Sequence, residues 1–287
     1  MRLASTSIPC ILLVLMSCVG ATAYQANLKT TLKQRYQDKV FYLRTPLSGS
    51  KLSFNSQGEP VGKVGPGYWS SDAGLLIDQL ELQNSKLHLR ATRVIFLFDT
   101  KDGTFRRFRT KAKVEIDIDV NPNWTDETSF TGALDRIVTP DSAVLAKEAS
   151  GYWACWLTGE LTHDAGKQRW NCHDKDEAMP GDKRQPDTHD VTLSPKDGSI
   201  SAPRAIYTPD PEYTKAAQEA GLRAATVVLW ATISEEGRAT NIQIQRPVGA
   251  GLDDKAIEAV QRWRFRPAMK NGSPVAVRIN IEINFRL

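Results

Sequence analysis

Period-two alternation of apolar and polar residues marks the last part of the chain most clearly. From residue 275 to residue 287 every odd position is apolar, and every even position after Ala276 is polar. An alternation of this length predicts a strand with one buried face and one wet face. The free edge of such a strand needs either a partner or protection. The apolar positions are Val275, Val277, Ile279, Ile281, Ile283, Phe285 and Leu287, and the polar ones are Arg278, Asn280, Glu282, Asn284 and Arg286.

Two helices and two further strands are predicted just upstream. Residues 210–221 begin with Asp-Pro-Glu, continue with alanines at helical spacing and end in Gly, which is typical of a short helix. Residues 225–234 and 241–245 have strand composition, with a Gly-containing hairpin turn between them. Residues 252–263 carry acids at the start, an arginine near the end and an apolar stripe between. The predicted order is therefore helix, strand, strand, helix, strand.

Several short pieces of this stretch fall in order at characteristic spacings: Pro211-Glu212-Tyr213, Thr226–Leu229, Gly237, Gly251–Ala256, Ala259-Val260, Trp263–Ala268, Asn271–Val275 and Phe285–Leu287. Together they resemble the TonB C-terminal domain family over about residues 200–287. One departure is Ala225, where members of the family often carry Gly. The resemblance implies an α+β domain in which helices lie on one side of a three-stranded antiparallel sheet. Trp263 lies on the apolar stripe of residues 252–263, so we expect it to anchor the core of this domain, and we expect Phe265 and Pro267 beside it to be structural as well.

The resemblance further implies how the domain works. In this family a partner's extended peptide adds beside the final strand, so we expect the periplasmic peptide of an outer-membrane receptor to dock there by β-augmentation. Two alternatives stay open: the polar face only protects the edge from aggregation, or the edge pairs with a second copy in a homodimer. The residues assigned to partner binding are Val275, Val277, Arg278, Asn280, Glu282, Asn284 and Arg286.

The region before this domain has a different pattern. Several short strands separated by turn clusters occur between residues 40 and 120, which favours a β-rich antiparallel domain within an α+β protein. We expect a helix at residues 142–149 and a long polar loop at residues 163–190. The predicted division is a leader at 1–23, a β-rich domain at 24–195, a linker at 196–202 and the TonB-like domain at 203–287.

Residues 1–23 resemble a secretory signal, with Arg2, a short apolar core and Ala21-Thr22-Ala23 as the cleavage site. Two alternatives remain open. The sequence before Cys18 resembles a lipobox, which would make the protein a lipoprotein, and an uncleaved segment would serve as an anchor. Each of the three predicts export across the inner membrane to the periplasm. The Pro-rich spacer typical of the TonB family is absent from the sequence.

Two cysteines remain after the leader, Cys155 and Cys172. In an exported chain the simplest expectation is one disulfide between them. Metal binding with His163 and His173 is an alternative, although the spacing matches no standard zinc pattern, and two free thiols are another.

Composition and motifs favour a binding protein over an enzyme. The net charge of +4 is too small to indicate nucleic-acid binding, and the basic run at residues 106–109 is better explained as a solvated strand face. Glu115, Asp117 and Asp119 alternate and so suit a wet strand face better than a Ca²⁺ site or a catalytic pair. Trp153 and Trp156 are of a type that stacks on a sugar or base, but a buried cluster near Cys155 is the better explanation. We expect no catalytic site, no cofactor and no bound metal.

Two classes of function follow from these observations. The first is a periplasmic TonB-like protein that binds an outer-membrane receptor in energy-dependent envelope transport. The second is a structural or sensory envelope protein that uses its TonB-like domain for docking without energy transduction. The resemblance favours the first, and the missing spacer favours the second.

Overall fold

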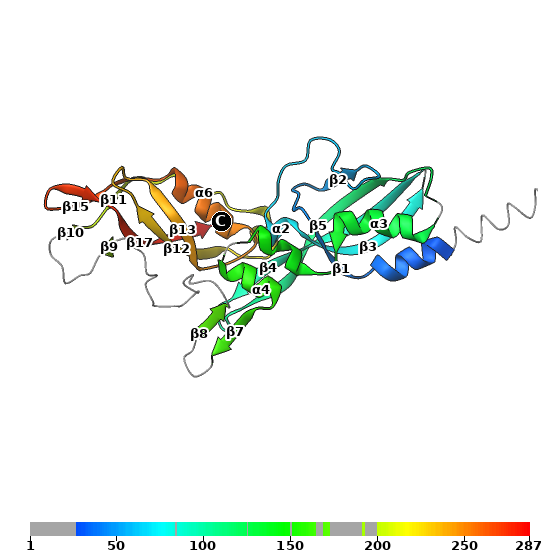
Figure 1. Cartoon of the computed structure of the whole chain (residues 1–287), viewed down its shortest axis with the longest axis horizontal. Helices are drawn as coiled ribbons and strands as arrows, with labels where there is room; N and C mark the ends of the chain where they lie inside the picture. Colours follow the sequence, from blue (N-terminus) through cyan, green and yellow to red (C-terminus); the bar gives the residue numbers. More distant parts are fainter. Residues whose placement is uncertain are drawn as a thin grey trace, which may run out of the picture.

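The computed structural model describes residues 27–83, 85–124, 126–149, 151–164, 169–172, 191–192 and 200–287. The predicted leader and most of the predicted linker lie outside these ranges. Helices and strands are mixed throughout, so the prediction of an α+β fold is confirmed. Two parts lie end to end along the long axis (Figure 1). We call residues 27–158 the N-terminal half and residues 200–287 the C-terminal half. Within the described residues no helix has both the length and the apolar character to cross a membrane.

The N-terminal half is built on one six-stranded sheet. Its two longest strands, β4 and β5, form an antiparallel hairpin that pairs from Lys86↔Asp119 to Asp99↔Thr104. Each of these strands joins two shorter strands that the sequence predicts separately. The strand order is β2-β5-β4-β3-β1-β6. The bounds are β1 Val40–Leu43, β2 Lys51–Phe54, β3 Gly74–Gln83, β4 Lys86–Asp99, β5 Thr104–Asp119 and β6 Val138–Thr139.

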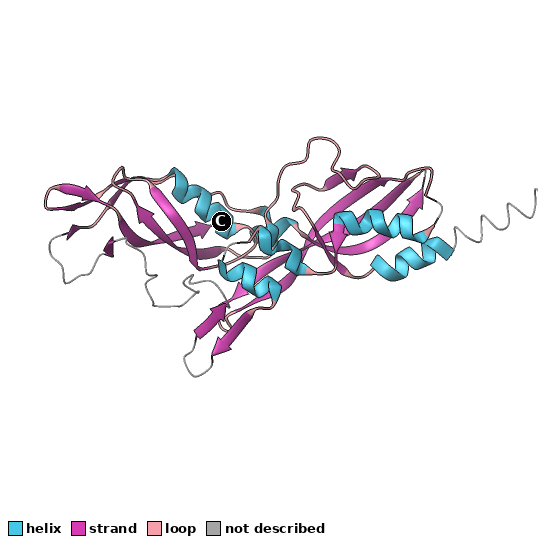
Figure 2. Cartoon of the chain, in the orientation of Figure 1, coloured by secondary structure: helices cyan, strands magenta, loops and turns pink. Residues whose placement is uncertain are grey.

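Two helices, over residues 27–36 and in α3 (Glu127–Ile137), lie over one face of this sheet (Figure 2). Leu28, Leu32 and Tyr36 of the first helix pack into the same core as the inward side chains of the strands. Asp126 caps α3 by accepting a hydrogen bond from the Ser129 backbone N–H at 2.8 Å. This core packs one face of the sheet against the two helices.

A second cluster of the N-terminal half is aromatic and lies near the turn that joins β4 to β5. It contains Trp69 from α2 (Trp69–Asp72), Phe96, Phe105 and, from α4 (Gly151–Thr158), Trp153, which is only 1% exposed. A 3₁₀ helix, η1 (Ser142–Lys147), stands where the sequence predicts a helix at 142–149. Burial of Trp153 supports the packed-core explanation of these aromatic residues over a stacking site.

The predicted long loop after α4 contains a hairpin instead, so that part of the expectation is wrong. β7 (Leu161–Asp164) pairs antiparallel with β8 (Arg169–Cys172). Thr162 and Trp170 supply the strand preference that the surrounding polar residues mask in the sequence. Cys155 is disulfide-bonded, and its pairing with Cys172 stays a prediction.

The C-terminal half contains a four-stranded sheet in the order β13-β12-β17-β9. The three strands expected from the sequence pair antiparallel, and β9 adds a parallel strand that the sequence does not predict. α6 lies against this sheet (Figure 1). The bounds are β9 Val191–Thr192, α5 Lys215–Glu219, β12 Ala224–Ile233, β13 Ala239–Arg246, α6 Leu252–Arg262 and β17 Val277–Arg286.

Short strand pairs extend the C-terminal half at its outer end. β10 (Ile200–Ser201) pairs with β15 (Ala268–Lys270), which also pairs with β16 (Ser273–Val275). β11 (Arg204–Tyr207) pairs with β14 (Arg264–Arg266). Part of the predicted linker at 196–202 is therefore strand. The single long strand expected from Val275 is interrupted at Ala276, so Val275 belongs to β16 and pairs with Ala268 rather than lying in β17.

Candidate partner-docking edge

β17 pairs along its whole length with β12 on one side. The register runs from Val277↔Ile233 to Arg286↔Ala224. Val277, Ile281, Ile283 and Phe285 are buried toward α6, and they pack with Val227 and Leu229 of β12 and with Ala256 and Val260 of α6. The apolar alternation in the sequence thus fixes which face of β17 meets the helix.

The other side of β17 is largely unpaired. Among the described residues only β9 meets it, with Val277↔Val191 and Arg278↔Thr192. From Ile279 to Arg286 no described strand pairs with this side of β17. The unpaired stretch offers alternate backbone N–H and C=O groups to an added strand. We call residues 277–286 of β17, seen from this side, the docking edge.

The polar residues assigned to partner binding divide into two groups. Asn280, Glu282, Asn284 and Arg286 are exposed, and Asn284 accepts a hydrogen bond from the Thr226 hydroxyl at 2.8 Å. These four side chains stand beside the docking edge. They can therefore contact alternate side chains of a strand that adds there.

Arg278 differs from the other polar residues of β17 because it is only 4% exposed. Its guanidinium donates to the Gln243 side-chain oxygen at 2.5 Å and lies 5.4 Å from the ring centroid of Trp230. Trp230 pairs with Gln243 across β12 and β13, so these contacts cross three strands on the face opposite α6. The expectation that Arg278 lies on a wet face is therefore wrong.

The residues assigned to structure lie where the C-terminal half turns from α6 back into the sheet. Phe265 is buried in the core, whereas Trp263 is only partly buried at its margin. The Trp263 indole N–H donates to the Pro209 carbonyl at 3.1 Å and ties the chain before α5 to the end of α6. Pro267, between β14 and β15, is also partly buried.

The start of α6 is fixed by a buried carboxylate. Asp253 is 2% exposed, and it accepts hydrogen bonds from the backbone N–H groups of Val248 at 2.8 Å and Gly249 at 2.9 Å. Burial raises the pKa of Asp253 to about 7, although these two hydrogen bonds favour the ionised form. Burial likewise raises the pKa of the neighbouring Asp254 to about 7. The loop before α6 is thus held in one conformation.

That loop is where the two halves meet. The Ala250 N–H donates to the Phe96 carbonyl, and the Phe98 N–H donates to the Val248 carbonyl, both at 2.9 Å. The Ser70 hydroxyl accepts from the Gly251 N–H at 2.9 Å, so the N-terminal half caps α6. Ile95 also packs into the core of the C-terminal half. These contacts use β4, α2 and the start of α6, not the docking edge.

Tyr68 adds a polar contact to the same interface. Its hydroxyl donates to the Glu258 carboxylate at 2.5 Å, and the Lys255 ammonium lies 5.2 Å from its ring centroid. Lys255 in turn contacts Glu212 at 2.8 Å and Glu258 at 3.1 Å. The Tyr68 phenol of the N-terminal half therefore meets an ion-pair cluster that lies wholly within the C-terminal half, and this polar contact favours one relative orientation of the two halves.

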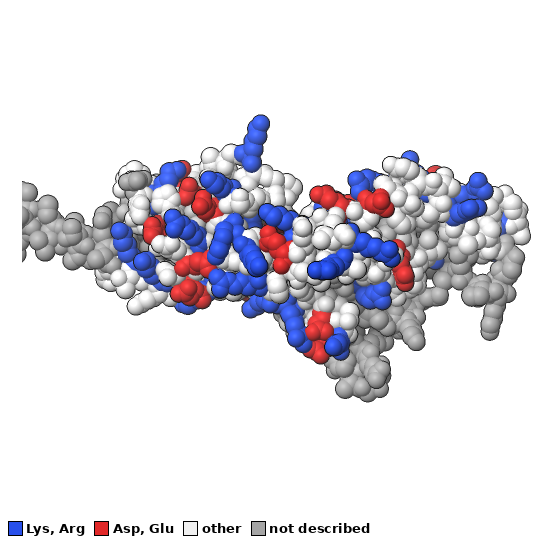
Figure 3. All heavy atoms as spheres, turned by 180° about the vertical axis from the view of Figure 1, so that it is seen from behind, with Lys and Arg blue, Asp and Glu red and all other residues white. Residues whose placement is uncertain are grey.

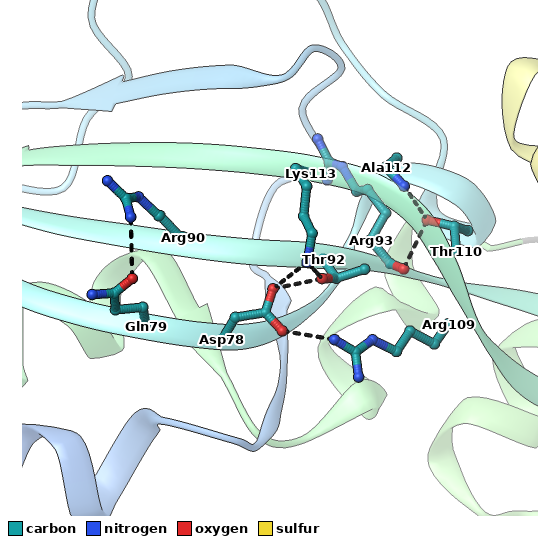
Figure 4. A network of polar contacts seen from close by, with 9 residues as sticks. All are labelled: Asp78, Gln79, Arg90, Thr92, Arg93, Arg109, Thr110, Ala112 and Lys113. Carbon is teal, nitrogen blue, oxygen red and sulfur yellow. Dashed lines mark hydrogen bonds and ion pairs between the residues drawn. The ribbon is translucent and has the colours of Figure 1, made fainter.

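The solvent face of the N-terminal sheet is a network of paired charges. Asp78 of β3 contacts Thr92 of β4 and Arg109 and Lys113 of β5 (Figure 4). These contacts hold the pKa of Asp78 below its usual range, with hydrogen bonds and positive charges outweighing partial burial. Arg93, by contrast, is buried, and it donates to the carbonyls of Leu47, Gly49 and Asp72.

The three alternating acids of β5 are also paired across strands. Glu115 contacts Lys51 at 3.7 Å, Asp117 contacts His88 at 2.6 Å and Asp119 contacts Lys86 at 3.0 Å. Within the described residues no group of three or more His, Cys, Asp or Glu side chains has the geometry to hold a metal ion. The positions of these acids match the wet strand face expected from the sequence.

The basic run at residues 106–109 does not form a single-sign surface. Arg106 contacts Asp99 and Asp102, Arg109 contacts Asp78, and the Arg107 guanidinium lies 5.5 Å from the ring centroid of Tyr42. Figure 3 shows Lys and Arg interspersed with Asp and Glu on the face that it presents. This arrangement suits a solvated sheet.

Comparison with known proteins identifies the C-terminal half. The family model for the Gram-negative bacterial TonB protein C-terminal matches residues 209–287. Protein TonB of Vibrio cholerae is 35% identical over 78 residues, which are 27% of this chain and 32% of that protein. Protein tonB2 of Pseudomonas aeruginosa is 32% identical over 83 residues, 29% of this chain and 30% of that protein.

A solution NMR structure of the Pseudomonas aeruginosa TonB CTD is also similar. It is 27% identical, the match covers 35% of this chain and 96% of that chain, and the TM-score is 0.26. The present chain spans about a third of the length of the curated relatives that it matches.

Proposed function

Since residues 209–287 form a TonB C-terminal domain, we propose that the protein binds a partner in the bacterial envelope through the docking edge of β17. The partner that best suits this edge is the periplasmic peptide of an outer-membrane receptor. The single observation that carries the proposal is the side of β17 from Ile279 to Arg286, with which no strand of the described residues pairs.

The physical argument rests on what an unpaired strand offers. When a partner strand adds, the backbone groups of both strands replace hydrogen bonds to water with hydrogen bonds to each other. The complete ladder of these hydrogen bonds supplies affinity without a binding pocket. Asn280, Glu282 and Asn284 beside this edge have no bulky apolar side chain. Specificity would therefore come from polar pairs across the new ladder.

The attachment of the N-terminal half to the C-terminal half bears on whether the protein transduces energy. The backbone hydrogen bonds between β4 and the loop at 248–250 attach the two halves directly. Because the docking domain is attached in this way, a partner bound to β17 would hold the N-terminal half close to itself. This observation favours the second candidate function, docking in the envelope without energy transduction, for a chain that has no Pro-rich spacer.

Location follows from the predicted leader. A protein with a periplasmic partner must be exported, and cleavage after Ala23, lipidation at Cys18 or retention of the apolar segment would each achieve this. The mass of the mature N-terminus and membrane fractionation distinguish the three. A retained segment is the form that permits direct coupling to an inner-membrane motor.

The docking proposal is tested by peptide binding to the full chain. Fluorescence anisotropy would measure the affinity of labelled peptides that copy the periplasmic segments of outer-membrane receptors from the same organism. We expect Glu282→Lys to change the affinity of a binding peptide at least fivefold, because residue 282 stands beside the added strand. Glu160→Lys, the same charge reversal at an exposed residue between α4 and β7, is the control. Equal effects of the two variants would contradict the proposal.

A further inference from the structure

The docking edge is already partly occupied by the protein's own chain. Val191 and Thr192 form β9 and pair in parallel with Val277 and Arg278 at the start of β17. In Figure 1 β9 lies beside β17 at the outer part of the C-terminal half. β9 comes from the segment between the two halves, so it reaches this edge from outside the TonB C-terminal domain.

We propose that Val191–Thr192 are a built-in competitor strand, which a partner must displace before it can pair with the whole docking edge. The proposal rests on the function proposed above and adds a form of regulation to it. A short partner strand can add along residues 279–286 alone, whereas a longer one meets β9 at residue 278.

The strength of this competitor follows from its length. A ladder of two residue pairs contributes only a few backbone hydrogen bonds, each with a small net stabilisation. Covalent attachment compensates in part, because a tethered strand has an effective concentration of the order of millimolar. β9 is therefore strong enough to cover the edge at rest and weak enough to be displaced by a longer strand.

Coverage at this position also protects the protein. An unpaired strand edge is a template for pairing with other chains. β9 covers the edge at Val277, the wholly buried core residue with which β17 begins. The polar residues of β17 are exposed from Asn280 onward. β9 therefore protects the start of the edge against pairing with other chains, and the exposed polar side chains protect the remainder.

The first experiment tests coverage by hydrogen exchange in the full chain. Val191→Pro/Thr192→Pro removes the N–H groups of β9, while Val191→Ala/Thr192→Ala keeps them and serves as the matched control. We expect the protected amides among residues 277–279 to exchange at least fivefold faster in the proline variant and within twofold of wild type in the alanine variant. Unchanged exchange in the proline variant would overturn the inference.

The second experiment tests competition with the receptor-peptide panel described above. For a peptide of ten or more residues we expect the proline variant to bind about three to ten times more tightly than wild type, and the alanine variant to bind like wild type. Equal affinities for all three proteins would overturn the inference and leave the docking proposal standing. If no peptide binds any of them, the docking proposal fails, and the exchange result alone decides whether β9 covers β17.

Discussion

Gly249 lies directly against the backbone of Phe96, and the two belong to different halves of the protein. Gly249 has φ +90°, and a Cβ atom built on it would overlap the Phe96 carbonyl oxygen. Leu97 and Gly249 form an isolated antiparallel bridge at this point. Glycine is therefore required here for two reasons, the positive φ and the close approach of β4.

Gly249→Ala should consequently destabilise the contact between the halves. We expect a loss of about 2–4 kcal/mol in the free energy of unfolding, measured by urea denaturation, because backbone strain and a backbone clash add. Gly272→Ala is the control, since Gly272 has φ +84° but nothing within 4 Å of the added atom. That variant should lose only about 1 kcal/mol. Equal losses would mean that the close approach to Phe96 contributes nothing.

The two carboxylic acids at the start of α6 predict a pH dependence of stability. Burial raises the pKa of Asp254 to about 7, and Glu258 and Asp72 act in the same direction while Lys255 opposes them. An acid with a raised pKa binds a proton in the folded state that the unfolded state has released, so stability should fall as pH rises from about 4 to about 7.

Asp254→Asn removes this titration. We expect the variant to be more stable than wild type by about 1–3 kcal/mol at pH 8 and to show a flatter stability profile between pH 4 and 7. Urea denaturation at a series of pH values measures both. A variant that is less stable than wild type at pH 8 would show that Asp254 is a stabilising, ionised residue of the helix N-terminus.

Trp263 and Phe265 should contribute unequally to the core. Phe265 is 6% exposed, and Phe265→Ala should cost about 3–5 kcal/mol. Trp263 is partly buried, so Trp263→Ala should cost about 2–3 kcal/mol. Trp263→Phe should cost less, because it keeps an aromatic ring in place and loses the hydrogen bond to the Pro209 carbonyl. Thermal and chemical unfolding of the full chain would rank the three variants. A loss below about 1 kcal/mol for Trp263→Ala would point to a binding role for the exposed part of its ring.

The disulfide at Cys155 is expected to close on Cys172. Non-reducing peptide mass spectrometry should find these two peptides linked. On the chain-entropy model, reduction should lower the free energy of unfolding by about 3 kcal/mol. Free thiols at both positions in periplasmic protein would contradict the pairing.

The sequence predicts those parts of the fold whose pattern is local. The alternation in β17 and the apolar stripe of α6 each specify one buried face, and both elements lie where their patterns place them. The helix α3 gives a weaker signal, because Thr128, Thr131 and Gly132 within it have low helix propensity, and tertiary packing decides its conformation.

The parts that could not be predicted depend on contacts between distant residues. Val191-Thr192 is β-branched but too short to predict a strand by itself, and its partners Val277 and Arg278 lie far away in the sequence. Arg278 itself alternates like an exposed residue, yet Gln243 and Trp230 from neighbouring strands bury it. The use of Ser70 as the cap of α6 joins residues 181 positions apart, which no local pattern encodes.

The central claim, that a partner strand adds to the docking edge, is tested most directly by amide hydrogen exchange of the full chain with and without a tightly binding receptor peptide. The account predicts slower exchange at the outward-facing amides between Ile279 and Arg286, with the amides of β13, at the opposite end of the sheet, unchanged. Protection of another surface, with residues 279–286 exchanging as in the free protein, would contradict it.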